Sequence, residues 1–176
     1  MKNFLSIFAF LVFAFVIAPN SSAWAVDQMD VSVGLKTLPL MNNKISGSAA
    51  MAVIFDPANP ASKAEADEVK ALIDAGLEAP GGIKISALMV PSTDLSKLSG
   101  AKIGFVAKGA CTDAVSAAAA SNGILTMTTE LDCVKSSKCI LGVVSKPRVE
   151  IFYSKSAADA AKIGFSQAFS MLVSQV

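Results

Sequence analysis

The chain contains, between Ala101 and Cys139, the stretch AKIGFVAKGACTDAVSAAAASNGILTMTTELDCVKSSKC. It opens with a short apolar run, residues 103–107, and continues with an alanine-rich segment, residues 112–122. A second apolar run, residues 124–127, follows. Strand, helix and strand in this order indicate a right-handed crossover, which places the two strands parallel in one sheet.

Apolar runs elsewhere in the chain predict further strands of the same sheet. They lie at residues 49–55, 83–90, 140–144 and 149–153, and the last two form a hairpin around Lys146-Pro147-Arg148. Strands that alternate with helices favour a mainly parallel sheet covered on both faces. We therefore predict an α/β fold: a three-layer sandwich with an antiparallel C-terminal hairpin, in a single domain spanning residues 26–176.

Three helices are predicted besides the alanine-rich one. The pattern Ser62-x-x-Glu65 matches a capping box, which predicts a helix start at Ser62, and Pro80-Gly81-Gly82 predicts its end. Apolar spacing predicts a short helix over residues 31–38. A terminal helix is expected to start near Ser156 and to run towards Val176.

The N-terminus has the pattern of a secretory signal peptide. Lys2 precedes an apolar stretch, residues 4–18, and Ala23-Trp24-Ala25 is an A-x-A cleavage site. We expect residues 1–25 to be removed on export to the periplasm.

Export predicts a definite mass for the mature protein. Protein isolated from the periplasm should have the intact mass of residues 26–176 in mass spectrometry, because cleavage follows Ala25. Full-length chain recovered from the membrane fraction would contradict this expectation.

Composition excludes several classes of function. The chain has 15 basic and 14 acidic side chains, and removal of the signal peptide takes away Lys2 and no acid. Such a balance argues against nucleic acid as a partner, which needs concentrated positive charge. Histidine is absent from the sequence, which excludes Ser-His and Cys-His pairs and imidazole zinc sites. We predict no enzyme activity, no catalytic residue, no cofactor and no metal site.

Polar residues follow the predicted parallel strands and form a candidate rim for a ligand or a partner. Ligands of such sheets bind outside the carboxyl ends of the strands. The alternative is that these residues cap helices and close turns. The rim residues are Asp56, Asn59, Ser62, Ser92, Thr93, Lys108, Thr112, Thr128 and Thr129.

Three segments resemble the YfiR/HmsC-type family of small periplasmic proteins. Residues 124–128, ILTMT, resemble a strand of that family, residues 133–144 its cysteine-bearing loop and next strand, and residues 157–167 its C-terminal helix. The resemblance extends over residues 30–176 in element order. The chain departs from the family at Thr129, where the family has Asp, and at Ser137-Lys138, where it has a Gly pair.

The resemblance implies a fold like one lobe of a periplasmic binding protein. It also implies a regulatory module whose partner is the periplasmic domain of a membrane-bound sensor or diguanylate cyclase. The turn at residues 56–62, DPANPAS, resembles one class of transporter-linked binding proteins, so a solute-binding protein with a small ligand is the alternative. A lobe of this size would need a homodimer or loops to close a cleft.

Three cysteines, Cys111, Cys133 and Cys139, leave one unpaired in a monomer. Together with closeness in sequence, the resemblance favours a Cys133–Cys139 disulfide. Cys111 competes for Cys133, because both follow parallel strands at one sheet edge. In the favoured pairing Cys111 is a buried thiol or an intermolecular link.

Overall fold

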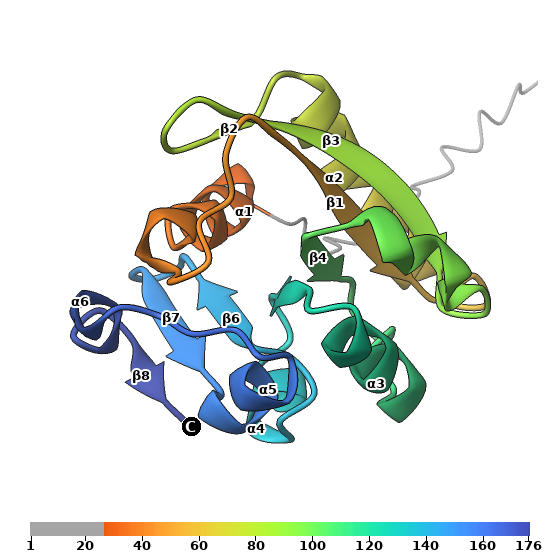
Figure 1. Cartoon of the computed structure of the whole chain (residues 1–176). Coiled ribbons are helices and arrows are strands. Elements are labelled where there is room, and N and C mark those ends of the chain that lie inside the picture. The colour runs from red at the N-terminus through yellow and green to blue at the C-terminus, as the bar shows by residue number, and fades with distance from the viewer. Residues whose placement is uncertain (1–26) are drawn as a thin grey trace, which may run out of the picture.

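A computed structural model describes residues 27–176 and is shown in Figure 1. The predicted signal peptide, residues 1–25, lies outside the described residues. Within residues 27–176, no helix is long and apolar enough to cross a membrane.

Helices and strands alternate along most of the described chain. In order they are α1 (Gln28–Leu35), the 3-10 helix η1 (Leu38–Leu40), β1 (Ser48–Phe55), α2 (Pro60–Asp74), β2 (Glu78–Ala79), β3 (Ile83–Pro91), the 3-10 helix η2 (Leu95–Gly100), β4 (Ile103–Val106), α3 (Asp113–Ser121), β5 (Leu125–Thr128), α4 (Leu131–Lys135), β6 (Leu141–Val144), β7 (Glu150–Tyr153), α5 (Lys155–Ala160), α6 (Gln167–Ser170) and β8 (Ser174–Gln175).

The strands form one sheet in the order β2-β3-β1-β4-β5-β6-β7-β8. Neighbours from β3 to β6 pair in parallel, and β6 and β7 form an antiparallel hairpin with Val143 opposite Ile151. The predicted α/β class, parallel sheet and C-terminal hairpin are therefore confirmed. The short strand β8 pairs in parallel with β7 and so extends the sheet beyond the hairpin.

Alternate residues of the central strands face two hydrophobic clusters, one on each side of the sheet. Val53 of β1 and Phe105 of β4 pack with α1 and α2 on one side. Ile54 and Val106 pack with η2, α3 and α4 on the other. Period-two alternation with both faces apolar is the reason these strands appear as continuous apolar runs in the sequence.

The prediction for α2 was wrong at both ends. The helix starts at Pro60, and its N-cap is Asn59, whose side-chain oxygen accepts the N–H groups of Ala61 and Ser62. Proline at the first helical position needs no N–H partner, so this start is favoured over Ser62. The helix ends at Asp74, and Gly76, at φ +94°, turns the chain into β2 before the Pro80-Gly81-Gly82 segment.

The prediction of one continuous terminal helix towards Val176 was also wrong. The chain forms α5, which begins at Lys155, close to the predicted start, with Ser154 as its N-cap, and then α6 and β8. Between α5 and α6, the Gly164 carbonyl accepts the Asn42 N–H (2.9 Å), and the Ser166 N–H donates to the Leu40 carbonyl (2.8 Å). These long-range bonds use backbone groups that a continuous helix would keep for itself, so tertiary pairing overrides helical spacing here.

Candidate functional site

The strand order reverses between β1 and β4, because the strand that follows β1 in the chain, β3, lies on one side of it and β4 lies on the other. Such a switch point is the usual place for a ligand in this kind of fold. In this chain the crevice at that point is filled by its own loops. Gly109, at φ +78°, approaches the turn after β1 so closely that a Cβ there would lie 2.6 Å from Nδ2 of Asn59. Any side chain at residue 109 would therefore force the two loops apart.

Glu65 of α2 lies at the same crevice and binds the loops on its rim. Its side chain is buried, with 8% exposed, and its Oε2 accepts the backbone N–H of Lys108. Its Oε1 accepts the hydroxyl of Thr129 (2.9 Å). One carboxylate thus joins the segments that follow β4 and β5.

Burial raises the pKa of the Glu65 carboxyl above its ordinary value. The hydrogen bonds from the Lys108 N–H and the Thr129 hydroxyl oppose this shift, and the nearby charge of Glu130 adds to it. Glu65 is therefore a carboxylate held in an unfavourable environment by two fixed donors.

A cavity of about 550 Å³ opens beside Glu65, at the carboxyl ends of β4, β5 and β6. We call it the strand-end cavity. It combines acidic groups, two lysines and an apolar wall. Its lining consists of Asp27, Asp30, Glu65, Lys108, Thr129, Glu130, Leu131, Val143, Val144, Ser145 and Lys146.

Acidic groups outnumber basic ones in this lining. Lys146 is paired with Asp27 (2.9 Å), and Oε2 of Glu130 accepts the Gly109 N–H (3.1 Å). Oδ1 of Asp30 is buried, yet it has no hydrogen-bond partner among the described residues. A buried acceptor without a partner is costly, so a donor group from a ligand or partner would stabilise this position.

Two of the nine predicted rim residues, Lys108 and Thr129, line the strand-end cavity. Asp56 closes a turn through the Ala58 N–H, and Ser62 accepts the Asp56 N–H. Local capping also occupies Asn59, Thr112 (N–H of Val115) and Thr128 (N–H of Glu130). Ser92 and Thr93 follow β3, on the far side of β1 from the cavity.

Sequence reasoning missed most of the acidic lining. Glu65 lies four residues before Val69, so it is on the buried stripe of α2 rather than on its solvent face. A carboxylate on an apolar stripe is the signal that could have identified it. Asp30 and Asp27 could not be placed, because their position depends on α1 packing against β6.

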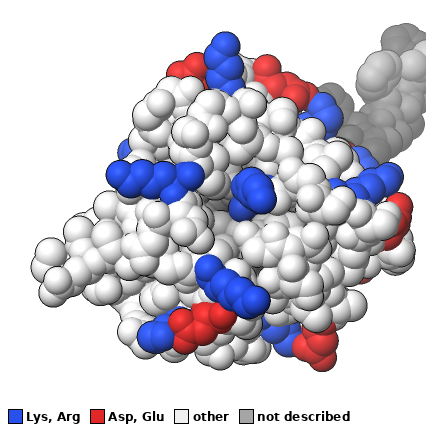
Figure 2. All heavy atoms as spheres, viewed as in Figure 1, with Lys and Arg blue, Asp and Glu red and all other residues white. Residues whose placement is uncertain are grey.

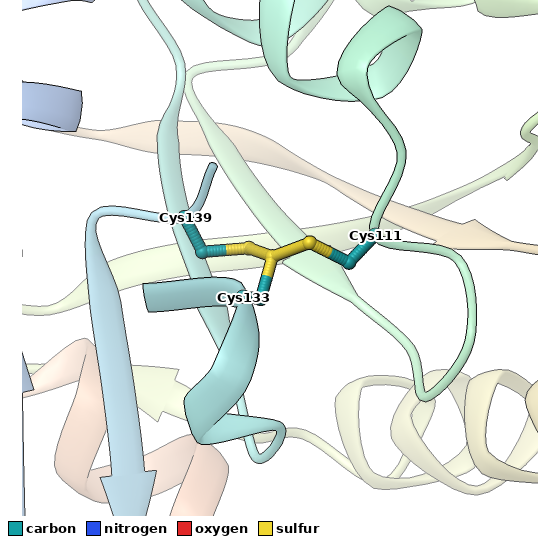
Figure 3. Close-up of side chains that lie close together, drawn as sticks. All are labelled: Cys111, Cys133 and Cys139. Carbon is teal, nitrogen blue, oxygen red and sulfur yellow. A yellow bond between two sulfur atoms is a disulfide. The ribbon is translucent and has the colours of Figure 1, made fainter. Parts of the chain in front are cut away.

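The three cysteines come from different elements and meet on the side of the sheet that α3 covers (Figure 3). Their Sγ atoms all lie within 4.8 Å of one another. Cys133 and Cys139 are buried, whereas Cys111 is partly exposed, which differs from the buried Cys111 predicted from sequence. Cys133 lies within bonding reach of both partners, so the predicted Cys133–Cys139 pairing and its competitor are both geometrically accessible.

A larger cavity, of about 730 Å³, lies at the opposite edge of the sheet. Ser48, Lys102 and Gly123 place it at the amino ends of the strands, away from the predicted rim.

On the face seen in Figure 1, charged side chains are separated by uncharged surface rather than gathered into one basic area (Figure 2).

Comparison with known proteins gives matches by structure. No protein-family model matches the chain, and no curated protein sequence does either. A ligand-free, open substrate-binding protein with adhesive properties from Clostridium difficile superposes with a TM-score of 0.61 at 12% identity, covering 86% of this chain and 59% of its own. An ABC domain in complex with L-Trp from Streptococcus pneumonia gives 0.57 at 13%, covering 85% and 59%.

A conserved domain protein from Vibrio cholerae gives 0.56 at 14% identity, covering 84% of this chain and 59% of its own. The chain shares its fold with part of these proteins. It spans about three-fifths of their length. At these identities the likeness concerns the fold alone.

The raised pKa of Glu65 predicts a pH-dependent stability. The folded state holds the Glu65 proton more tightly than the unfolded state, so this contribution is present below the unfolded pKa and is lost as pH rises through the folded pKa. Glu65→Gln removes the charge and keeps an acceptor for Lys108 and a donor for Thr129. We expect the wild type to lose stability relative to this variant in urea unfolding as the pH rises above the ordinary pKa of a glutamate side chain.

Glu78→Gln provides the matched control, because Glu78 is exposed on the short strand β2. The difference in unfolding free energy between Glu78→Gln and the wild type should not change with pH in the same way. A wild type that gains stability relative to Glu65→Gln as pH rises would contradict the burial argument.

Proposed function

We propose that this protein is an exported, non-enzymatic binding module that restrains or senses for a membrane-bound signalling protein, such as a diguanylate cyclase. The strand-end cavity carries the proposal, because the buried acceptor Asp30 Oδ1, which finds no hydrogen-bond partner within residues 27–176, lies there at the strand ends where such folds bind ligands. The signal peptide predicted from the sequence supports the location, and the resemblance to the YfiR/HmsC-type family supports the kind of partner. Its neighbours by fold include a substrate-binding protein.

The chemistry of the cavity indicates what it binds. Asp30 and Glu130 supply acceptors, and Leu131, Val143 and Val144 supply apolar surface. A segment of the partner that presents a cationic N–H donor next to apolar side chains would complement both. We propose that the partner's periplasmic domain contributes such a segment.

A double variant, Asp30→Asn with Glu130→Gln, tests the site. We expect binding to the isolated periplasmic domain of the partner to weaken about tenfold or more in calorimetry, because charge-assisted hydrogen bonds are lost. Asp132→Asn with Glu78→Gln is the control, since it makes the same changes at exposed positions outside the lining. Equal weakening by both pairs would show a general charge effect and contradict the assignment of the cavity.

Photo-crosslinking identifies the partner itself. A crosslinking residue at Ser145, in the cavity lining, should capture a membrane sensor or cyclase in cells, whereas one at Ser121, at the opposite edge, should not. Capture of transport components from Ser145 would favour the alternative function.

That alternative is a solute-binding protein of a transport system. The cavity volume of about 550 Å³ lies within the range of small-molecule sites, and one structural neighbour is described in complex with L-Trp. A small ligand that binds the folded chain should raise its melting temperature with ligand concentration. Such a shift, abolished by the cavity variant and kept by the control variant, would support transport over regulation.

A further inference from the structure

The arrangement of the three cysteines goes beyond a single structural disulfide. Cys111 lies in the loop between β4 and α3, Cys133 in α4, and Cys139 just before β6. The Cα atoms of Cys111 and Cys133 are 5.9 Å apart, and those of Cys133 and Cys139 are 5.3 Å apart. Both separations suit a disulfide, but one sulfur forms only one such bond, so the two pairings are alternatives.

We propose that Cys111, Cys133 and Cys139 form a thiol–disulfide exchange site. Cys133 alternates between its two partners, and in one state the Cys111 thiol is free to react with electrophiles or disulfides of other molecules. The site is independent of whatever the strand-end cavity binds.

Non-covalent contacts hold both outer cysteines near Cys133 in either state. The N–H of Cys139 donates to the carbonyl of Cys133 (3.1 Å), and Lys138 is paired with Asp113 at the start of α3 (2.8 Å). On the other side, the Gly109 N–H donates to Glu130, just before α4. Exchange therefore needs side-chain movement and no unfolding of the loops.

The exchange itself is balanced and needs no oxidant. The Cys139 thiolate attacks Sγ of Cys133 in the Cys111–Cys133 disulfide. A Cys133–Cys139 bond forms as the Cys111–Cys133 bond breaks, and the bonding electron pair leaves with Cys111, which takes a proton from water. The reverse attack by Cys111 restores the first state.

Exposure makes the two states chemically different. Cys139 is 1% exposed, so its free thiol in the first state is shielded from reagents. Cys111 is partly exposed, so its free thiol in the second state is accessible. External thiol chemistry should therefore concentrate on Cys111, even though Cys133 is the residue shared by both disulfides.

N-ethylmaleimide labelling of protein purified without reductant tests the exchange. Samples taken at intervals at about pH 8 are quenched with acid, because the thiolate is the attacking species. Cys111 and Cys133 share one tryptic peptide, so trypsin is combined with a protease that cleaves after Glu130, and the peptides are mapped without reduction. We expect both pairings at the start, followed by labelled Cys111 rising until all molecules carry a Cys133–Cys139 bond.

Single variants provide the matched controls. Cys139→Ser should keep Cys111 linked to Cys133 and unlabelled throughout. Cys111→Ser should also stay unlabelled, because its two remaining cysteines, Cys133 and Cys139, are joined to each other. A single pairing from the start, fixed proportions of two pairings, or label on Cys139 would each overturn the proposal. Immediate labelling of all three cysteines would also overturn it and would indicate a three-thiolate site for a soft metal ion instead.

Discussion

Replacing Phe105 by alanine is expected to lower the free energy of unfolding by about 3–5 kcal/mol. Phe105 lies in β4 at the centre of the sheet, opposite Val53 of β1 and Met127 of β5, and only 2% of it is exposed. Alanine removes the aromatic ring from the cluster shared with α1 and α2 and leaves a cavity that the flanking strands cannot fill without breaking their register. Urea unfolding followed by circular dichroism measures the loss.

Met171→Ala is the control for this substitution. Met171 is 81% exposed after α6, so its truncation should change stability by less than about 0.5 kcal/mol. If Phe105→Ala lost less than about 1 kcal/mol, the packing of α1 and α2 against β4 would be wrong.

The elements predicted correctly are those whose signal is local. The strands β1 and β4 are buried on both faces, so each appears as a nearly continuous apolar run, and β5 differs only in its two buried threonines. The helix α3 has both a capping Thr112 and a terminating Gly123, and its bounds were predicted to within one residue. Where the local sequence preference and the tertiary packing favour the same structure, the sequence pattern alone predicts the element.

The C-terminal segment shows the opposite case. Its helical spacing is real, but Gly164 pairs with Asn42, and Phe169 packs against Tyr153 with ring centroids 5.0 Å apart. The first contact joins segments more than a hundred residues apart in sequence, and the second joins the terminal segment to β7, so no local pattern within the segment could predict either of them.

The location of the candidate site could be predicted from the sequence, but most of its lining residues could not. Parallel strands bring their carboxyl ends to one edge, and Lys108 and Thr129 do line the cavity there. The hydroxyl-rich residues nearer β1 instead satisfy backbone N–H groups, as Ser62 does for Asp56. Hydroxyl side chains in turns commonly accept hydrogen bonds from nearby backbone N–H groups. Only the tertiary structure shows which hydroxyl groups are left to bind a ligand.

Cys133→Ser should have the second largest effect on stability, because it removes both alternative disulfides at once. The two pairings span separations of 22 and 6 residues. The chain-entropy model assigns about 3 kcal/mol to the longer loop and about 2 kcal/mol to the shorter one. Cys111→Ser and Cys139→Ser each keep one pairing, so both should lose less than Cys133→Ser.

Reductant separates the disulfide from the side chain itself. Cys133 is 3% exposed, so a serine hydroxyl there adds a burial cost that has nothing to do with cross-linking. With an excess of reductant the wild type should lose about 2–3 kcal/mol, whereas Cys133→Ser should hardly change. If instead the wild type unfolded at the same urea concentration with and without reductant, α4 would be held by packing alone: Gly142 of β6, where a Cβ would lie 2.9 Å from Val134, already brings that helix directly onto the sheet.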